Sequence, residues 1–537
     1  MCSIPFASKD GLRNALPEIE MLREIGGTAG MSIGVMHRGR VVLEHNFGFA
    51  DVDKKIVAGP STRYPLASLT KAFVAATIAQ LVHEGVLDWD APITTYIPEL
   101  SFQADPALAK HLTLRDILSH NTGLIRLDAL WLGAENEVNI PKNYTIPLCN
   151  HLRPVYSLRS KWLYNNWMYA LASEVIERVT NMSWGQALDQ KVLKKAGLDQ
   201  TTVHKSAIPE GSTALPYIVL DYKSLARTGD LGLTDGELMS SAGGIRSTIH
   251  DMLSWGNTLL ATFRYDDGPL WAIDTILSGQ SFIGRSTTVD ELYSMGFAKV
   301  VIPAQFGKTG FNPSLVDAMP TVGDSHNYQV FYHNGAVPGY NNCFMIIPGL
   351  DAVIVVLTNS ISQGDTADWA AQTLLQAVLD IKFPVDIVSY AEASSEKWRT
   401  TYTRISNTLD AERIPGTDEP SRRDLVGTYS HSTGALYLEV YEDENKIFMF
   451  RINGKQSQAH VLLHYHYHTF VFLPSADERI RRGLFHYGPH AWLLSFEKNK
   501  KGEVDRVVWS LDEQAITEGE VFFRETKSWA ANQCILS

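Results

Sequence analysis

A serine and a lysine three positions apart, Ser68 and Lys71, are the residues of this chain whose types and spacing best suit nucleophilic chemistry. Positions i and i+3 share one face of a helix, so the two side chains would project together. A hydroxyl at a helix N-terminus lies beside free N–H groups and the positive end of the helix dipole, which favour an attacking alkoxide. A lysine with apolar neighbours loses hydration, which lowers its pKa toward that of a general base.

The Ser-x-x-Lys spacing alone is not specific, because it occurs again at Ser394 and Lys397. The same pattern also describes a serine that caps a helix and a lysine that reaches solvent. The surroundings separate the two copies. Residues 72–79, which follow Lys71, are almost all apolar and predict a buried helix, whereas Ser394 lies in a polar, charged stretch. We therefore expect the chemistry at Ser68.

The helix that carries Ser68 is predicted to begin close to that residue, because Pro65 disfavours helical backbone just before itself, and to end near Gly85. An amphipathic helix is expected over residues 10–26 and a pair of strands over residues 31–49. Further apolar strands and a closing helix are expected over residues 343–347, 352–357 and 366–380.

Acyl transfer by a serine also needs a base, donors for the oxyanion and a proton for the leaving group. Tyr164 and His333 are candidates from other parts of the chain, and Asn166 is placed to cap a following helix. Residues 113–123 predict a short helix that Thr113 caps and Gly123 ends. His120, near its C-terminus, is either a base or a residue favoured there by the helix dipole.

The order and spacing of these pieces resemble the three motifs of the serine β-lactamase-like family, which includes class C β-lactamases, DD-peptidases and esterases. The motifs are Ser68-x-x-Lys71, Tyr164-x-Asn166 and His333-x-Gly335. Residues 112–124, 242–248 and 333–359 also look like the family's helix-loop segment, glycine loop and paired active-site strands. The resemblance covers roughly residues 10 to 380.

The resemblance implies an α+β fold with a catalytic domain of the β-lactamase/transpeptidase type, an antiparallel sheet flanked by helices plus a helical subdomain. We expect this domain over residues 1–384, a charged, partly helical linker over residues 385–422, and a β-domain over residues 423–537. Short strands recur in the last part, which suggests a small barrel or sandwich. The stretch from Leu425 to Ser430 resembles the lipocalin-like domain appended to some peptidases of the family.

The resemblance also implies roles for individual residues. Ser68 would be the acylated nucleophile, Lys71 would hold or take its proton, and Tyr164 would act as general base and then donate to the leaving group. Backbone N–H groups of Ser68 and Ala336 would form the oxyanion hole. The residues expected to bind substrate are Asn166, His333, Asn334, Gly335 and Ala336.

The third motif departs from the Lys-Thr-Gly usual in lactamases of this group, because His333-Asn334-Gly335 stands there. A neutral histidine anchors a carboxylate less well than a lysine. We therefore expect a serine hydrolase for small esters, amides or peptides. Two alternatives remain: an acyltransferase that passes the acyl group to a small-molecule acceptor, as in secondary metabolism, and a non-catalytic scaffold or filament-forming protein.

Histidines at 464, 466 and 468 alternate with tyrosines in the C-terminal β-region. On a strand the three would share one face, where they suit a metal ion, although any half-buried strand shows such alternation. We expect no metal and no cofactor.

The composition of this 537-residue chain limits the kinds of partner and the cellular location that we expect. Its net charge of -12 argues against nucleic acid, because nothing would neutralise the phosphates. There is no apolar stretch long enough for a membrane span and no secretory signal, and the four cysteines are scattered, so we expect a cytoplasmic protein. Cys534 lies in a C-terminal prenylation box, but without a basic run a single lipid would anchor weakly. The oligomeric state is open.

Overall fold

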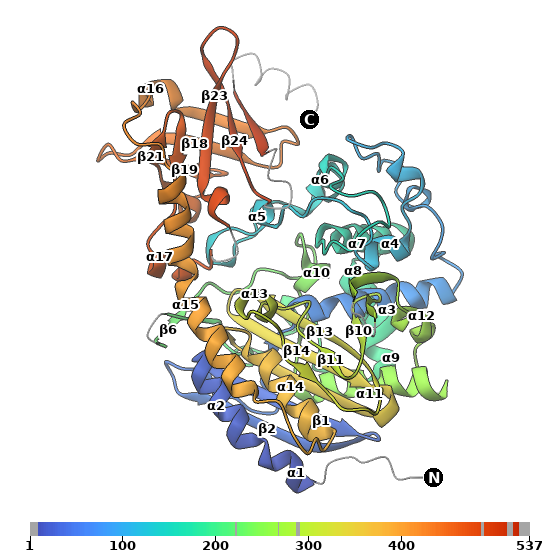
Figure 1. Ribbon diagram of the computed structural model, residues 1–537. Helices are drawn as coiled ribbons and strands as arrows, with labels where there is room; N and C mark the ends of the chain where they lie inside the picture. Colours follow the sequence, from blue (N-terminus) through green and yellow to red (C-terminus); the bar gives the residue numbers. More distant parts are fainter. Residues whose placement is uncertain are drawn as a thin grey trace.

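A nine-stranded antiparallel sheet lies at the centre of the larger part of the molecule (Figure 1). The computed structural model describes residues 9–220, 223–266, 268–285, 290–484, 488–512 and 519–525. Across the sheet the strands are β3 (Ile56–Val57), β2 (Arg40–Asp51), β1 (Gly30–His37), β15 (Ala352–Thr358), β14 (Tyr340–Ile347), β13 (Gln329–Val337), β10 (Ala298–Val301), β9 (Asp290–Tyr293) and β8 (Ser281–Arg285).

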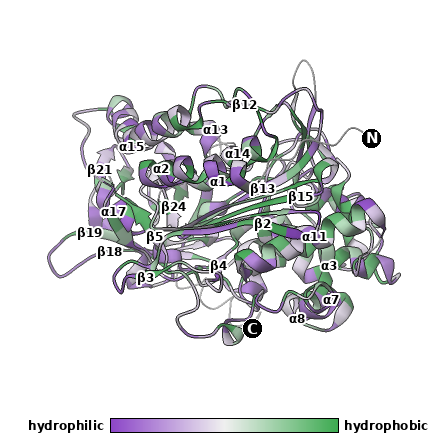
Figure 2. Ribbon diagram, turned by 90° about the horizontal axis from the view of Figure 1, so that it is seen from below, coloured by the Kyte–Doolittle hydropathy of each residue, from purple (hydrophilic) through white to green (hydrophobic). Residues whose placement is uncertain are grey.

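Helices cover both faces of this sheet (Figure 2). On one side lie α1 (Lys9–Asn14), α2 (Leu16–Gly26) and α14 (Thr366–Val378), and on the other lies α11 (Ile249–Tyr265). Side chains of β15 alternate between the two cores: Val353 and Val355 join one hydrophobic cluster, whereas Ile354 and Val356 join the other. A strand buried on both faces reads as a continuous apolar run, which is how β15 appears in the sequence.

The helical subdomain surrounds α3 (Thr70–His83), whose residues from Thr70 to Leu81 are all buried. It includes α4 (Leu114–Leu118) and α7 (Trp167–Thr180). Thr113 caps α4 through a capping box, as predicted, but the helix ends at Leu118, before Gly123. The helix predicted over residues 10–26 is divided at Ala15, because Pro17 near the start of α2 cannot donate a backbone hydrogen bond.

Helix α15 (Ile387–Glu412) fills most of the stretch predicted to be a linker. Asp386 caps it by accepting a hydrogen bond from the Ser389 N–H. The helix runs from the domain built on the first sheet toward the C-terminal strands, in orange in Figure 1. The charged residues that suggest a linker lie on this amphipathic helix, and the residues that break helices follow shortly after it.

The C-terminal region forms a second nine-stranded antiparallel sheet, curled into a nearly closed barrel. Its edge strands, β20 and β21, are separated in the chain by Leu462 alone. In order, the strands are β20 (Ala459–Val461), β19 (Phe448–Ile452), β18 (Tyr437–Glu442), β17 (Gly427–His431), β25 (Glu520–Arg524), β24 (Val504–Trp509), β23 (Leu493–Lys498), β22 (Thr469–Val471) and β21 (Leu463–His466). The predicted fold class, an α+β domain followed by a small all-β unit, is confirmed.

The predicted face of three histidines does not form. Strand β21 ends at His466, and the backbone turns at Tyr467, whose φ is 46°. His468 therefore falls beyond the strand that carries His464 and His466.

None of the helices among the described residues combines the length and apolar character that crossing a membrane would need. Cys534, on which the prenylation prediction rests, lies outside the described residues.

Candidate active site

Ser68 lies in a short 3₁₀ turn, η1 (Ala67–Leu69), which leads into α3. The residue before it, Ala67, has a φ of 51°, a left-handed conformation that is unfavourable for alanine. Its neighbours hold this backbone in place: the Leu66 N–H donates to the Ile245 carbonyl at 2.7 Å, and the Asn342 side chain donates to the Pro65 carbonyl at 2.9 Å. Such enforced strain is common at functional sites.

Two further predicted side chains meet the Ser68 hydroxyl. Lys71 Nζ donates to Ser68 Oγ at 3.1 Å and to the Ala242 carbonyl at 2.9 Å. The Tyr164 hydroxyl, which lies 96 positions further along the chain, donates to the same Oγ at 2.8 Å. The first and second motifs therefore converge on one oxygen atom, and the glycine loop holds the lysine that reaches it.

Burial gives the two partners of Ser68 different protonation tendencies. Burial, opposed by the charge of Asp128 and aided by that of Arg126, lowers the pKa of Lys71 to about 7. Burial raises the pKa of Tyr164 far above its ordinary value, although its hydrogen bond to Ser68 opposes the shift. Near neutral pH, Lys71 can therefore accept a proton, whereas Tyr164 holds one.

His333 is buried beside this centre. Its Nε2 lies 3.0 Å from the Tyr293 hydroxyl, and its Nδ1 lies 2.5 Å from the Asn334 carbonyl oxygen. Burial and the nearby Lys71 lower the pKa of His333 to about 3, so the imidazole is neutral at physiological pH. The position that carries a lysine in many lactamases is thus uncharged here.

Gly335 and Asn334 are placed differently from the expected substrate contacts. A Cβ at Gly335 would lie 2.3 Å from the Leu66 carbonyl oxygen, so the glycine allows β13 to approach the turn that carries Ser68. The Asn334 side chain points to the opposite face of the sheet, where its amide donates to Asp365 and Asp368. It supports the strand from behind rather than facing the site.

Ala336 lies at the edge of the site. Pairing of β13 with β10 stops at Tyr332. Further along β13, the N–H of Asn334 points away from β14 and donates to Thr309 Oγ1 at 3.0 Å. Residues two apart on a strand direct their N–H groups to the same side, so the Ala336 N–H points toward this open edge.

Asn166 precedes α7, but its side chain does not cap that helix as predicted. Its amide nitrogen instead donates to Asp128 Oδ1 at 2.9 Å. Asp128 also pairs with Arg126 at 3.0 Å and accepts from the Trp131 indole at 3.2 Å. Arg126 and Asp128 were not predicted individually. Arg126 precedes the short helix α5 (Asp128–Trp131) and Asp128 begins it, in a stretch whose sequence carries no motif that marks these two residues.

The C-terminal barrel reaches this segment through Asp512. One carboxylate oxygen of Asp512 accepts the Arg126 N–H at 2.7 Å and the Leu127 N–H at 3.4 Å. Leu127 is left-handed, with a φ of 43°. The barrel therefore holds the turn that presents Asp128 to Asn166, a link of almost 400 positions that no local pattern indicates.

His120 is fully buried against the site residues. Its ring centroid lies 4.2 Å from that of Tyr164, and its Nδ1 accepts the Asn165 N–H at 3.1 Å. Burial, with Lys71 and His333 nearby, lowers its pKa well below the ordinary value. His120 packs against Tyr164, and no hydrogen bond joins it to Ser68.

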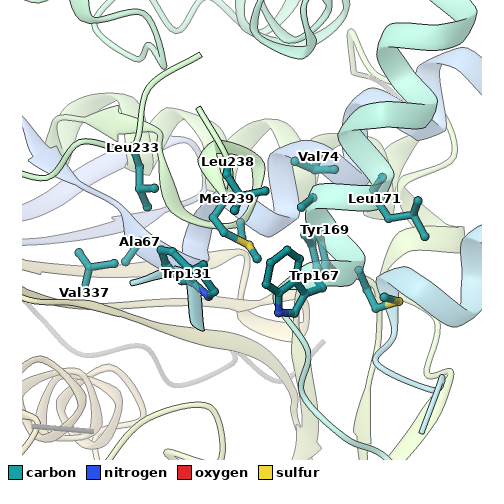
Figure 3. Packing of buried hydrophobic residues seen from close by; sticks show 14 of the residues in the cluster. Ala67, Val74, Trp131, Trp167, Tyr169, Leu171, Leu233, Leu238, Met239 and Val337 are labelled. Atoms are coloured by element: carbon teal, nitrogen blue, oxygen red, sulfur yellow. The ribbon is translucent and has the colours of Figure 1, made fainter. Parts of the chain in front are cut away.

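A cavity of about 960 Å³ opens over Ser68. Its walls come from the catalytic domain, from α15 and from the barrel. Figure 3 shows part of the apolar wall, where Trp131, Met239 and Val337 lie near Ala67. Ser68, Tyr164, Asn166 and Ala336 line the cavity, whereas His333, Asn334 and Gly335 do not.

One cluster among the described residues has the composition of a metal site: His151, His431 and Glu520. His151 Nε2 and His431 Nε2 lie 2.6 and 3.1 Å from one oxygen of Glu520, and Arg153 contacts the other at 2.7 Å. These groups pair with one another across the junction of catalytic domain and barrel. The histidines at 464, 466 and 468 form no such group in the described part of the chain.

Comparison with known proteins gives two family matches, a beta-lactamase model over residues 19–377 and a domain of unknown function (DUF3471) over residues 412–526. Protein flp of Staphylococcus aureus (strain MW2) is 22% identical over 62% of this chain and 60% of its own length. The unguisins hydrolase ungD' of Aspergillus campestris is 24% identical over 66% of this chain and 62% of its own. The chain thus spans less than two thirds of either relative.

Solved structures share the fold at low identity. A penicillin-binding protein homologue from Pyrococcus abyssi, described as octameric, is 18% identical with a TM-score of 0.57, covering 95% of this chain and 99% of its own. A class C beta lactamase from Rhodobacter sphaeroides is 21% identical with a TM-score of 0.54, covering 69% of this chain and 99% of its own. Because the first family model spans well over half of the sequence, the chain belongs to the beta-lactamase family.

Proposed function

We propose that the protein is a serine hydrolase that forms an acyl-enzyme on Ser68 and acts on esters, amides or peptides. The observation that carries the proposal is the convergence of Lys71 and Tyr164 on one hydroxyl oxygen, at 3.1 and 2.8 Å. Membership of a family of serine hydrolases supports it, as does the relative named as a hydrolase. The burial that lowers the pKa of Lys71 to about 7 also favours a catalytic role over a scaffolding one.

In the first step, Ser68 Oγ attacks the substrate carbonyl while its proton passes to neutral Lys71. The carbonyl oxygen becomes an oxyanion, which the N–H groups of Ser68 and Ala336 would bind. When the tetrahedral intermediate collapses, the bond to the leaving group breaks and Tyr164 donates its proton to that group. The Lys71 ammonium then returns a proton to Tyr164, which restores both residues.

In the second step, a water molecule attacks the acyl-enzyme carbonyl and loses a proton to Lys71. The ester bond to Ser68 Oγ breaks, the Lys71 ammonium returns its proton to Oγ, and the carboxylic acid leaves. Asn166, whose amide nitrogen donates to Asp128 at 2.9 Å, would bind the carbonyl side of the substrate amide or ester. The pKa directions of Lys71 and Tyr164 favour Lys71 as the base and Tyr164 as the acid.

Labelling with a fluorophosphonate, followed by intact-protein mass spectrometry, tests the proposal. Wild-type protein should gain one phosphonyl group on Ser68, and Ser68→Ala should gain none. Ser394→Ala is a matched control, because it removes the serine of the second Ser-x-x-Lys pattern, and it should be labelled like the wild type. Labelling that persists in Ser68→Ala would contradict the assignment.

An acyltransferase is the second candidate, favoured by the roof that α15 and the barrel place over the cavity, since excluding water favours another acceptor. Adding small alcohols or amines to the acyl-enzyme distinguishes the two functions. A new ester or amide formed faster than free acid would assign transfer, and free acid alone would assign hydrolysis.

A further inference from the structure

One carboxylate of the C-terminal barrel, that of Asp512, contacts a strained turn beside the cavity. Asp512 follows β24, and its Oδ2 accepts the backbone N–H groups of Arg126 and Leu127 at 2.7 and 3.4 Å. Leu127 is buried and has a φ of 43°, in the left-handed region. A leucine adopts this backbone only at a cost in free energy, so an acceptor for the two N–H groups favours the turn.

The side chains on either side of Leu127 reach the candidate active site. Asp128 Oδ1 accepts a hydrogen bond from the Asn166 amide at 2.9 Å, and the Arg126 guanidinium lies 5.8 Å from the ring centroid of Tyr164. A side-chain amide has two N–H donors, so Asp128 can orient Asn166 through one and leave the other for the substrate. The conformation of the turn therefore sets the orientation of a side chain that lines the cavity.

A second carboxylate of the barrel supports the chain just before this turn. Glu520 of β25 is buried, and its two oxygens contact His151 Nε2 at 2.6 Å and Arg153 at 2.7 Å. The Arg153 carbonyl in turn accepts the Ile125 N–H at 3.0 Å. The barrel thus fixes the residues that lead into the turn as well as the turn itself.

We infer that Asp512 is a positioning residue for the acylation of Ser68. Its carboxylate holds the turn at Leu127, and Asp128, the next residue, orients Asn166 toward the substrate. The inference rests on the proposed function and adds a role for the barrel in it. The catalytic domain supplies the reacting groups, whereas the barrel supplies the carboxylate that keeps one substrate-binding side chain in place.

Substitutions of Asp512 in the full-length protein test the inference with two reactions. Turnover of p-nitrophenyl esters of N-acetylated amino acids involves Asn166, whereas a fluorophosphonate has no carbonyl group for Asn166 to bind. Asp512→Ala removes the acceptor, so it should lower kcat/KM for the esters by about 10-fold or more and keep the rate of labelling within about 3-fold of wild type. Asp512→Asn retains an amide oxygen as acceptor and should recover most of the ester activity.

A double-mutant cycle separates positioning from direct contact with the substrate, because Asp512 also lines the cavity. If Asp512 acts through Asn166, Asp512→Ala should lower kcat/KM by less than about 2-fold in an Asn166→Ala background. If it contacts the substrate itself, the two losses should multiply. Asp128→Ala breaks the intermediate link and should lower kcat/KM at least as much as Asp512→Ala, which keeps the inference testable if Asp512→Ala does not fold.

Tyr402→Phe is the control for a general loosening of the barrel. The Tyr402 hydroxyl, on α15, donates to the Pro474 carbonyl of the C-terminal region at 2.9 Å. Among the described residues, Tyr402 is not one of those that line the cavity. Its substitution should lower the melting temperature slightly and leave kcat/KM for the esters within about 2-fold of wild type. Thermal unfolding of every variant provides the comparison of stability.

Wild-type ester activity in Asp512→Ala, losses that multiply in the cycle, or an equal loss in Tyr402→Phe would overturn the inference while leaving the acylation of Ser68 standing. Failure of both the esters and the fluorophosphonate to modify Ser68 in the wild type would instead refute the proposed function. The two failures therefore give different results.

Discussion

Two segments of this chain share the Ser-x-x-Lys pattern and differ in everything around it. Lys71 is fully buried and donates to Ser68 Oγ at 3.1 Å. Lys397 keeps 34% of its side chain exposed and lies 4.0 Å from Asp317, and the structure gives no hydrogen bond between it and Ser394 among the described residues. Ser394 instead donates to the Ala391 carbonyl at 2.9 Å and accepts from Trp369.

The difference shows what a Ser-x-x-Lys pattern on a helix needs in addition to its spacing to form a candidate reactive centre. Both serines lie on helical turns, and both have a lysine one turn later. In the first pair, burial lowers the pKa of the lysine, and a tyrosine from a distant segment donates to the hydroxyl. In the second pair, the lysine side chain is one-third exposed. The second pair has a structural role, because Ser394 joins α15 to α14.

Loss of the Ser68 hydroxyl should give the largest difference in activity between the two serine segments. Ser68→Ala should lower kcat by about 10⁴-fold or more, because no other group would form the acyl-enzyme. Ser394→Ala should change kcat by less than about 2-fold and lower the melting temperature, since the Trp369 indole loses its acceptor. Steady-state kinetics and thermal unfolding of both variants check this. Equal losses of activity would remove the distinction between the segments.

Loss of the lysine charge should be the next largest effect. Lys71→Met should lower kcat/KM by about 10²- to 10⁴-fold, whereas Lys397→Met should be close to neutral. In the wild type, kcat/KM should rise as pH increases through about 7, because Lys71 then loses its proton. A pH profile that is flat between 5 and 9 would argue against Lys71 as the base.

The same lysine also affects stability. Its pKa is about 7 in the folded chain and 10.5 when unperturbed, so between these values the unfolded chain binds more protons. The free energy of unfolding contributed by Lys71 should therefore rise with pH across that window. Denaturant unfolding at several pH values should show this slope in the wild type and a smaller one in Lys71→Met.

Removing the Tyr164 hydroxyl tests the third side chain of the centre formed with Ser68 and Lys71. Tyr164→Phe should lower kcat/KM by about 10²-fold, with the greater loss on substrates whose leaving groups need a proton. Because the pKa of Tyr164 is raised, wild-type activity should not decline through its ionisation near pH 9 or 10. Esters with good and poor leaving groups, compared in both proteins, provide the measurement. An equal loss on both would assign Tyr164 to positioning.

A glycine packs against each of the two serine segments. Substituting these glycines should give the smallest effects and should separate activity from stability. A Cβ at Gly335 would meet the Leu66 carbonyl oxygen at 2.3 Å, and one at Gly364 would meet Ser394 Oγ at 2.5 Å. Gly335→Ala should slow labelling of Ser68 by about 10-fold, because its turn must shift. Gly364→Ala should lower the melting temperature and leave the labelling rate unchanged, since it strains the structural segment.

Much of the fold follows from local patterns. The unbroken apolar run after Lys71 predicts a buried helix, and the two apolar runs around Pro348 predict adjacent strands. The order of Ser68, Tyr164 and His333 predicts one shared centre, and the structure brings Lys71 and Tyr164 to Ser68. The catalytic roles given to them remain predictions.

Other parts of the site depend on contacts that no local pattern carries. The position of Asn166 suggests a helix cap, but its partner is Asp128, the first residue of the short helix α5 (Asp128–Trp131). Asn334 belongs to the third motif, yet strand alternation directs its side chain to the far face. Asp512 accepts the Arg126 N–H from almost 400 positions away in the sequence. The residues of α15 that line the cavity lie within a stretch whose polarity resembles that of a linker.

The roof over the cavity has a consequence for the chain during synthesis. Helix α14, which completes the catalytic domain, ends at Val378, whereas Leu511 and Asp512 come more than a hundred positions later. At ribosomal rates of roughly 5–20 residues per second, that interval is on the order of ten seconds. The residues around Ser68 are therefore synthesised before the barrel residues that complete the roof of the cavity, so the barrel must close over a site whose other walls are already made.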